Sequence, residues 1–206
     1  MYSKKFPFVC GYRHLRVFAA LLLIASANLA LTAQTPDRAA VTIKNFGTVN
    51  ERYYRGSQPF AENFAELKRL GVKTVIDLRA DKEEGEAGWA RTEGLQYFNI
   101  PLTTKRPATE EQVGYFLKLV ADPANWPVYV HCKGGKHRTG EMTAIYRITH
   151  DGWTADQAYE EMKRYDFEDG IFYPKSLKKY VFSFYERFAA GTSKADASEA
   201  SSRLRD

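Results

Sequence analysis

The chain has 206 residues, with 30 lysine and arginine residues against 25 aspartate and glutamate residues and a formal net charge of +5. Residues 1–33 hold four of the basic residues and no acidic one, which leaves 26 basic against 25 acidic residues in the remainder. A chain of about 170 residues suits one domain. Because this part of the chain is nearly neutral, its net charge gives no support to nucleic-acid binding. We therefore expect no nucleic-acid partner.

The N-terminal segment has the pattern of a secretory signal peptide. It begins with four cations, Lys4, Lys5, Arg13 and Arg16. The apolar residues 17–31 follow, a stretch shorter than the ~18 or more residues of a membrane-spanning helix. We expect cleavage after Ala33, with Ala27 or Ala30 as alternatives, export to the periplasm or the medium, and no stable membrane insertion afterwards. An uncleaved N-terminal anchor is the competing interpretation.

The remaining chain alternates predicted strands and helices. In chain order, periodicity and turn residues predict an initial extended segment at 41–49, an edge strand at 53–55, a helix at 60–70, a strand at 72–78, an acidic helical segment at 83–93, a strand at 95–100, a helix at 109–120, a strand at 128–130 and helices at 139–150, 154–165 and 175–189. This alternation predicts a single α/β domain over 34–190, with a mixed, largely parallel sheet flanked by helices on both faces. Residues 191–206 are small, polar and charged, and we expect a disordered tail.

The most informative motif is HCKGGKHRTG at residues 131–140. It follows a predicted buried strand, so that Cys132 falls at the carboxyl end, where ligands bind in open α/β sheets. Arg138 stands at the other end of the short loop, near the start of the next predicted helix. Cationic neighbours and a helix N-terminus favour the thiolate form of a cysteine, which is the nucleophilic form.

The same loop is predicted to bind a phosphoryl group. Backbone N–H groups at a strand-to-helix turn point inward toward an anion, and Arg138 has a planar fork that matches two phosphoryl oxygens. The predicted phosphate-binding residues are Lys133, Gly134, Gly135, Lys136, His137, Thr139 and Gly140. For His137 a solvated loop histidine is an equally acceptable interpretation. The motif lacks the three or four ligands of a zinc site, so we predict no metal site and no cofactor.

This run resembles the signature of the cysteine-dependent protein-tyrosine phosphatase superfamily: His-Cys, five residues, Arg, Ser or Thr, Gly. It is most similar to the atypical dual-specificity phosphatases of the plant and fungal type, with some likeness to the tensin-type lipid phosphatases. Two weaker likenesses lie upstream, at 54–59 (YRGSQP) and 75–79 (VIDLR). The resemblance covers roughly 46–190 and implies a protein-tyrosine-phosphatase-like fold.

The resemblance also implies roles for single residues. Cys132 would be the nucleophile that forms a phosphocysteine intermediate, and Arg138 would clamp the equatorial oxygens. Thr139 would donate a hydrogen bond to the sulfur, and His131 would fix the loop and help to hold the thiol ionised. Residues 133–138 would donate backbone N–H groups.

One expected component is missing. Members of the superfamily usually carry an aspartate general acid about thirty residues before the nucleophile, on a loop after a strand, but the matching residues 99–107 contain no carboxylate. The alternatives are Glu110 and Glu111, which the helix dipole explains equally well, or Asp166, Glu168 and Asp169. Arg55, Asp77 and Arg79 are further candidates for holding the pocket, and buried ion pairing explains them equally well.

The leading hypothesis is an exported cysteine-dependent phosphatase that hydrolyses phosphate monoesters, either phosphotyrosine and dual-specificity substrates or polyanions such as inositol phosphates. The cations Lys105, Arg106, Lys133 and Lys136 favour polyanionic esters or phosphoanhydrides, because a departing phosphate needs little protonation. The alternatives are a phosphate-binding module without turnover and, last, a redox-sensing thiol protein, since Cys132 is the only cysteine after residue 33.

Overall fold

The computed structural model describes residues 41–81, 85–168 and 175–203. The predicted signal peptide at 1–33 lies outside the described residues. Five strands form one sheet in the order β1-β2-β5-β3-β4. They are β1 (Gly47–Asn50), β2 (Tyr53–Ser57), β3 (Thr74–Arg79), β4 (Gln96–Leu102) and β5 (Val128–Cys132).

Four of the five strands run parallel, and only β1 pairs antiparallel, with β2. This arrangement confirms the predicted mixed, largely parallel sheet. The prediction that 53–55 is an edge strand is wrong, because β1 covers that edge and β2 lies between β1 and β5. All five residues of β2 are buried, because apolar clusters lie against both faces of the sheet.

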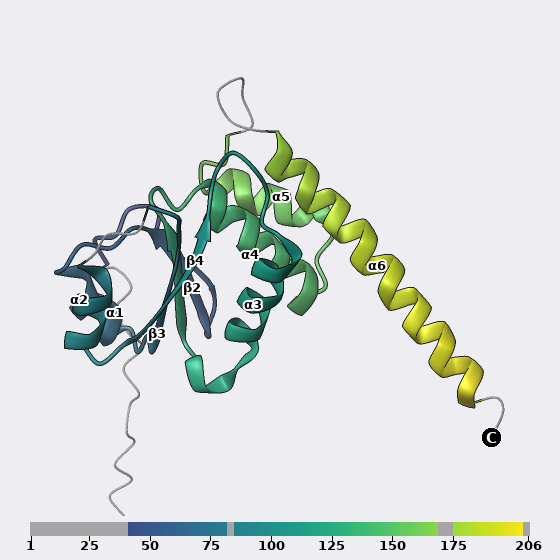
Figure 1. Cartoon of the computed structure of the whole chain (residues 1–206), viewed down its shortest axis with the longest axis horizontal. Helices are drawn as coiled ribbons and strands as arrows, with labels where there is room; N and C mark the ends of the chain where they lie inside the picture. Colours follow the sequence, from purple (N-terminus) through teal and green to yellow (C-terminus); the bar gives the residue numbers. More distant parts are fainter. Residues whose placement is uncertain (1–40, 82–84, 169–174, 204–206) are drawn as a thin grey trace, which may run out of the picture. The chain divides into compact units, whose positions relative to one another are not determined.

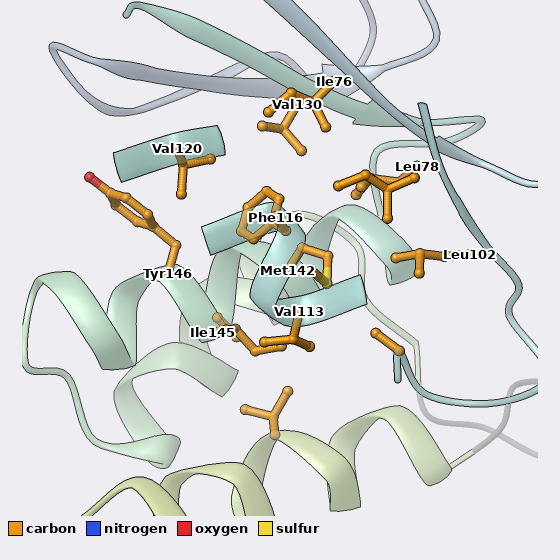
Figure 2. Close-up of a cluster of buried hydrophobic side chains, with 14 of the residues drawn as sticks. Ile76, Leu78, Leu102, Val113, Phe116, Val120, Val130, Met142, Ile145 and Tyr146 are labelled. Atoms are coloured by element: carbon orange, nitrogen blue, oxygen red, sulfur yellow. The ribbon is translucent and has the colours of Figure 1, made fainter. Parts of the chain in front are cut away.

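Helices cover both faces of the sheet (Figure 1). They are α1 (Asn63–Arg69), α2 (Glu86–Thr92), α3 (Glu110–Ala121), α4 (His137–His150), α5 (Ala155–Arg164) and α6 (Ser176–Arg203). α1 and α2 pack on one face around a smaller apolar cluster that includes Phe64, Leu67 and Tyr129. The other four helices enclose the larger cluster, where Figure 2 shows Phe116 and Met142 beneath the strand residues.

The ends of several helices follow from capping residues. Thr109 and Thr154 are the N-caps of α3 and α5. The side chain of each threonine accepts a hydrogen bond from the backbone N–H of a glutamine three residues on, and the side chain of that glutamine accepts one from the backbone N–H of the threonine. The predicted helix at 60–70 begins only at Asn63, because the Asn63 side chain accepts a hydrogen bond from the Phe60 backbone N–H and Phe60 remains 63% exposed.

The C-terminal prediction differs from the structure. α6 continues to Arg203, across most of the segment for which we expected disorder; residues 204–206 lie outside the described part. The segment is poor in apolar residues, which indicates that it cannot join a core, but alanine, lysine, glutamate and arginine all favour helix. Low hydrophobicity was therefore a poor predictor of backbone conformation here. Among the described residues, no helix is both long and apolar enough to span a membrane.

Candidate active site

The HCKGGKHRTG loop lies at the edge of the sheet where four parallel strands end. β5 ends at Cys132, its neighbour β2 ends at Ser57 directly opposite, and α4 begins at His137. The loop is thus the predicted strand-to-helix turn, with Cys132 before it and Arg138 in the first turn of α4. Both residues are nearly buried, with 3% and 8% of their surface exposed.

The upstream motif at 54–59 supports the conformation of this loop. Gly135 has a φ of 67°, and a Cβ atom added there would lie 2.5 Å from the carbonyl carbon of Gly56, so only glycine fits. Arg55 Nη2 donates a hydrogen bond of 2.6 Å to the carbonyl oxygen of Gly135, and Arg55 is fully buried. The guanidinium also stacks on the ring of Tyr165, at 3.9 Å from its centroid. Arg55 is therefore a positioning group for the loop, which favours the first of the two interpretations that the sequence left open, holding the pocket or buried ion pairing.

Several buried donors around the loop lack a partner among the described residues. Arg138 Nη1 donates to the carbonyl oxygen of Leu102 at 3.3 Å, but Arg138 Nε makes no hydrogen bond. Thr139 Oγ1 and two nitrogens of Arg55 are also unpaired and buried. Unpaired buried donors are unfavourable, and native structures seldom keep several in one place. A bound oxyanion would supply the missing acceptors.

His131 faces the opposite side of the sheet from Cys132, because successive side chains of a strand alternate between faces. Its ring stacks on Tyr129 and lies 3.4 Å from Glu86 Oε2 and 3.9 Å from Asp77 Oδ1. An effect of His131 on the thiol must therefore pass through the backbone and the loop.

Arg79 completes a buried charged cluster beneath the loop, which we call the Arg79 cluster: Asp77, Arg79, Glu86, Tyr97 and His131. Arg79 donates to Asp77 at 2.8 Å and to Glu86 at 2.6 Å. Burial raises the pKa of Asp77, but the hydrogen bonds from Arg79 and the charge of His131 lower it further, to a net value below the ordinary one. One atom each of Asp77, Glu86 and His131 lies within 4.8 Å of the others, a spacing that suits a metal ion, but the Arg79 guanidinium already supplies their positive partner.

The side chains of the loop divide between solvent and the segment after α5. Lys133 is exposed, while Lys136 pairs with Asp166 at 3.4 Å. His137 is buried against Phe167, and its Nε2 donates to the carbonyl oxygen of Glu168. Burial lowers the pKa of His137, which favours the neutral form of the ring. These contacts favour neither a solvated loop histidine nor a charged phosphate ligand.

The structure also separates the candidate acids. Glu110 pairs with Arg187 of α6, and Asp169 lies outside the described residues. Within the described ranges, the carboxylate that contacts Arg138 is Asp81, at 3.5 Å from Nη1, with 72% of its side chain exposed. Sequence reasoning missed Asp81, although it stands two residues after the carboxyl end of β3, at the ligand-binding edge.

Two other glutamates were missed because they stand in otherwise unremarkable helical patterns. Glu86 and Glu141 are both fully buried. Glu86 belongs to the Arg79 cluster, and Glu141 lies in α4 one turn after Arg138. Glu141 could have been identified from the sequence, because it is a charged residue on the predicted buried face of the helix that follows the HCKGGKHRTG motif.

A cavity of about 660 Å³ adjoins the loop. Its lining includes Lys44, Phe60, Lys133 and Lys136, together with Ser57 at the end of β2. The cavity is therefore cationic on the loop side and partly apolar on the α1 side. It is large enough for a ligand bigger than one phosphate group.

A family model described as "DSP-PTPase phosphatase fused to NAD+ Kinase" matches residues 34–179. The chain belongs to this phosphatase family. This phosphatase is 34% identical to the tyrosine-protein phosphatase OCA1 of Mycosarcoma maydis over 72% of the chain and 96% of OCA1. It is 32% identical to the dual specificity protein phosphatase TpbA of Pseudomonas aeruginosa, over 74% of the chain and 71% of TpbA.

Solved structures agree with the family. A structure of TpbA in complex with phosphotyrosine superposes with a TM-score of 0.58 at 28% identity, over 70% of this phosphatase and 90% of that chain. The catalytic core of Siw14, a PP-IP phosphatase of Saccharomyces cerevisiae, superposes with a TM-score of 0.61 at 23% identity, over 73% and 94% of the two chains. The latter shows the shared fold. The protein is thus a cysteine-dependent phosphatase of the dual-specificity type.

Proposed function

We propose that this phosphatase is exported and hydrolyses phosphate groups on polyanionic substrates, with Cys132 as nucleophile and Arg138 as the clamp on the transferred group. The observation that carries the proposal is the pair of buried donors at the start of α4 that lack acceptors among the described residues, Arg138 Nε and Thr139 Oγ1. The oxygens of a phosphoryl group can accept from Arg138, and the Cys132 sulfur is the acceptor proposed for Thr139.

The reaction has two steps. The Cys132 thiolate attacks phosphorus, an S–P bond forms, and the bond from phosphorus to the leaving oxygen breaks. Water then attacks phosphorus of the phosphocysteine, which breaks the S–P bond, releases inorganic phosphate and restores the thiolate. Backbone N–H groups of the loop and the Arg138 fork bind the equatorial oxygens in both steps, so that catalysis depends mainly on position and charge.

The surroundings of the loop favour a substrate with more than one phosphate. Lys44, Lys133 and Lys136 line the adjoining cavity, and of these three Lys136 alone has an acidic partner within the described part of the chain, Asp166. Lys105 and Arg106 lie exposed on the loop after β4. Among the similar proteins, the names of the rice and yeast relatives describe inositol diphosphatases, and TpbA was solved with phosphotyrosine. The lysine and arginine side chains near the loop support an inositol diphosphate, rather than phosphotyrosine, as the substrate type of this chain.

An alcohol or phenol leaves poorly without a proton, whereas a phosphate leaving from a diphosphate needs little help. Asp81 is the proposed proton donor for the first kind of leaving group, because it contacts Arg138 and is exposed toward solvent. Within this proposal, the phosphoanhydride reaction proceeds without Asp81.

Export is proposed from the pattern of the N-terminal residues. The family match begins at residue 34, the residue that would follow cleavage after Ala33. Mass spectrometry of the full chain expressed in a bacterial host tests this part. A periplasmic protein that begins at Gln34 supports it, and an intact N-terminus on a cytoplasmic protein would reject it.

The substrate proposal is tested with a chain that begins at Gln34, kept under reducing conditions. Release of inorganic phosphate is measured from an inositol diphosphate, a phosphotyrosine peptide and an aryl phosphate. We expect the highest kcat/KM on the inositol diphosphate, and loss of all three activities in Cys132→Ser. Equal or better turnover of the peptide would reject the preference for polyanions, and turnover that survives Cys132→Ser would reject the nucleophile.

A further inference from the structure

Glu141 is a buried carboxyl group that the reaction above does not use. It lies in α4 three residues after Arg138, on the same side of the helix, and none of its surface is exposed. Burial raises the pKa of Glu141 to about 8, with a smaller opposing effect from one backbone hydrogen bond. The carboxyl group is therefore largely protonated at pH 7.

Within the described ranges, the side chain of Glu141 makes one hydrogen bond, to the segment after β4. Glu141 Oε1 accepts the backbone N–H of Ala108 at 2.9 Å, and Ala108 immediately precedes Thr109, the N-cap of α3. The other end of this segment is Leu102, whose carbonyl oxygen accepts from Arg138 Nη1. Two residues one turn apart on α4 thus fasten both ends of residues 103–107.

Stability alone does not explain a carboxyl group at this position. Its Oε2 atom is buried and makes no hydrogen bond in the part of the chain that the structure describes. A methionine or leucine of similar volume would avoid the penalty at Oε2 and join the apolar cluster of Figure 2, to which Met142 belongs, although it would leave the buried Ala108 N–H without an acceptor. A buried polar group that is unfavourable for folding and adjoins a catalytic arginine indicates a functional use.

We propose that Glu141 is a positioning residue that holds residues 103–107 beside Arg138, and so sets Lys105 and Arg106 for substrates that carry a second phosphate. The inference rests on the proposed function and names the residue that enforces its substrate preference. The segment matches the loop on which the superfamily usually carries its general acid, but here it presents cations in place of an acid. Fixing its two ends restricts where those cations can lie.

The charged and titratable groups around Glu141 come from three elements. Arg138 shares α4, and Glu110 opens α3. On α6, Tyr180 responds to the charge of Glu141 and Arg187 pairs with Glu110. Ionised Glu141 would be a buried anion without a cation partner among the described residues, and its charge would disturb the segment that it holds through Ala108. We therefore expect the activity of the wild type to fall as the pH rises through about 8.

The experiment compares Glu141→Met, which fills the space without an acceptor, with Glu141→Gln, which keeps an acceptor but cannot ionise. Met142→Leu is the matched control, since Met142 is the next residue of α4 and is also fully buried. kcat and KM are measured for an inositol diphosphate and for an aryl phosphate from pH 6 to pH 9, together with thermal unfolding.

We expect Glu141→Met to lower kcat/KM on the inositol diphosphate by on the order of tenfold and on the aryl phosphate by less than about threefold, because the loop is misplaced while the nucleophile is not. Glu141→Gln should match the wild type at pH 7 and keep its activity above pH 8. Equal losses on both substrates, or none on the diphosphate, would overturn the positioning role. A wild type that hydrolyses neither substrate would reject the proposed function itself.

Discussion

Two adjacent residues of β5, His131 and Cys132, meet opposite environments because they lie on opposite faces of the sheet. His131 joins the Arg79 cluster, in which Arg79 connects two carboxylates through bonds of 2.6 and 2.8 Å. Cys132 leads into a loop where, among the described residues, Arg138 Nε and Thr139 Oγ1 have no acceptor. The His131 ring and Glu86 Oε2 also make no hydrogen bond in the described part, but there the opposite charges of Arg79, Asp77 and Glu86 compensate one another within the protein, whereas the Arg138 fork is open to an anionic ligand. Changes on the two sides should therefore affect different quantities.

The largest effect is expected on the Cys132 side. Arg138→Lys keeps the positive charge but removes the planar fork and the unpaired Nε. We expect kcat/KM for an aryl phosphate to fall on the order of 10³-fold, because transition-state charge loses its preorganised donor. The free energy of unfolding should change by no more than about 1 kcal/mol. If Arg138→Lys loses activity only because less of the protein is folded, then Arg138 affects stability in the same way as the Arg79 cluster, and the comparison fails.

The Arg79 cluster should show the reverse behaviour. Glu86→Ala leaves the Arg79 guanidinium short of one buried acceptor, and we expect a loss of about 3–5 kcal/mol in the free energy of unfolding. Glu160→Ala, which breaks the exposed pair with Lys163, is the control and should change stability by less than about 1 kcal/mol. Urea denaturation measures both. If Glu86→Ala instead leaves stability intact and abolishes turnover, the cluster belongs to the chemistry.

Glu141 lies in α4, the helix that follows the Cys132 loop, and it provides a further test of the comparison. We expect its carboxyl group to decrease the stability of the folded protein at neutral pH. Its pKa in the folded state, about 8, exceeds the ordinary 4.5, so that the folded protein holds the proton more tightly than the unfolded chain. Stability is therefore lost as the pH rises from about 4.5 toward 8, by about 1.4 kcal/mol per pH unit in that window.

Glu141→Gln removes this dependence. The difference in free energy of unfolding between the variant and the wild type is measured at pH 4 and at pH 7. Between these two pH values it should shift by about 3 kcal/mol in favour of the variant. Denaturation curves at several pH values provide the measurement. Parallel pH dependences for the wild type and the variant would show that Glu141 ionises normally in the folded protein.

Local patterns in the sequence predicted most of the fold. Helix and strand positions follow from apolar periodicity and from capping residues such as Thr109 and Thr154, and the nucleophile loop follows from the order of Cys132, Gly135 and Arg138. The order of the strands was not predicted in full, because β2 is short and its interior place depends on β1, which pairs across a turn. The extent of α6 was missed for the different reason that helix propensity and burial are separate properties.

The supporting residues of the site were harder to predict than the loop itself. Arg55 reaches Gly135 from 80 positions away, and Glu141 reaches Ala108 from 33. Such contacts depend on which strands are neighbours, and no local pattern contains that information. Asp81, the proposed proton donor, was overlooked for the same reason, since the sequence argument followed the loop after β4 and not the end of β3.

The smallest of these effects is expected at Asp81, and it appears only with some substrates. Asp81→Asn should lower kcat by about 10²-fold for an unactivated aryl or alkyl phosphate, whose leaving oxygen needs a proton, and leave turnover of an inositol diphosphate unchanged. A series of aryl phosphates of graded leaving-group pKa measures this, because the variant should depend more steeply on leaving-group pKa than the wild type. Asp156→Asn, at the exposed start of α5, is the control. Parallel dependences would show that Asp81 only pairs with Arg138 in the unliganded site.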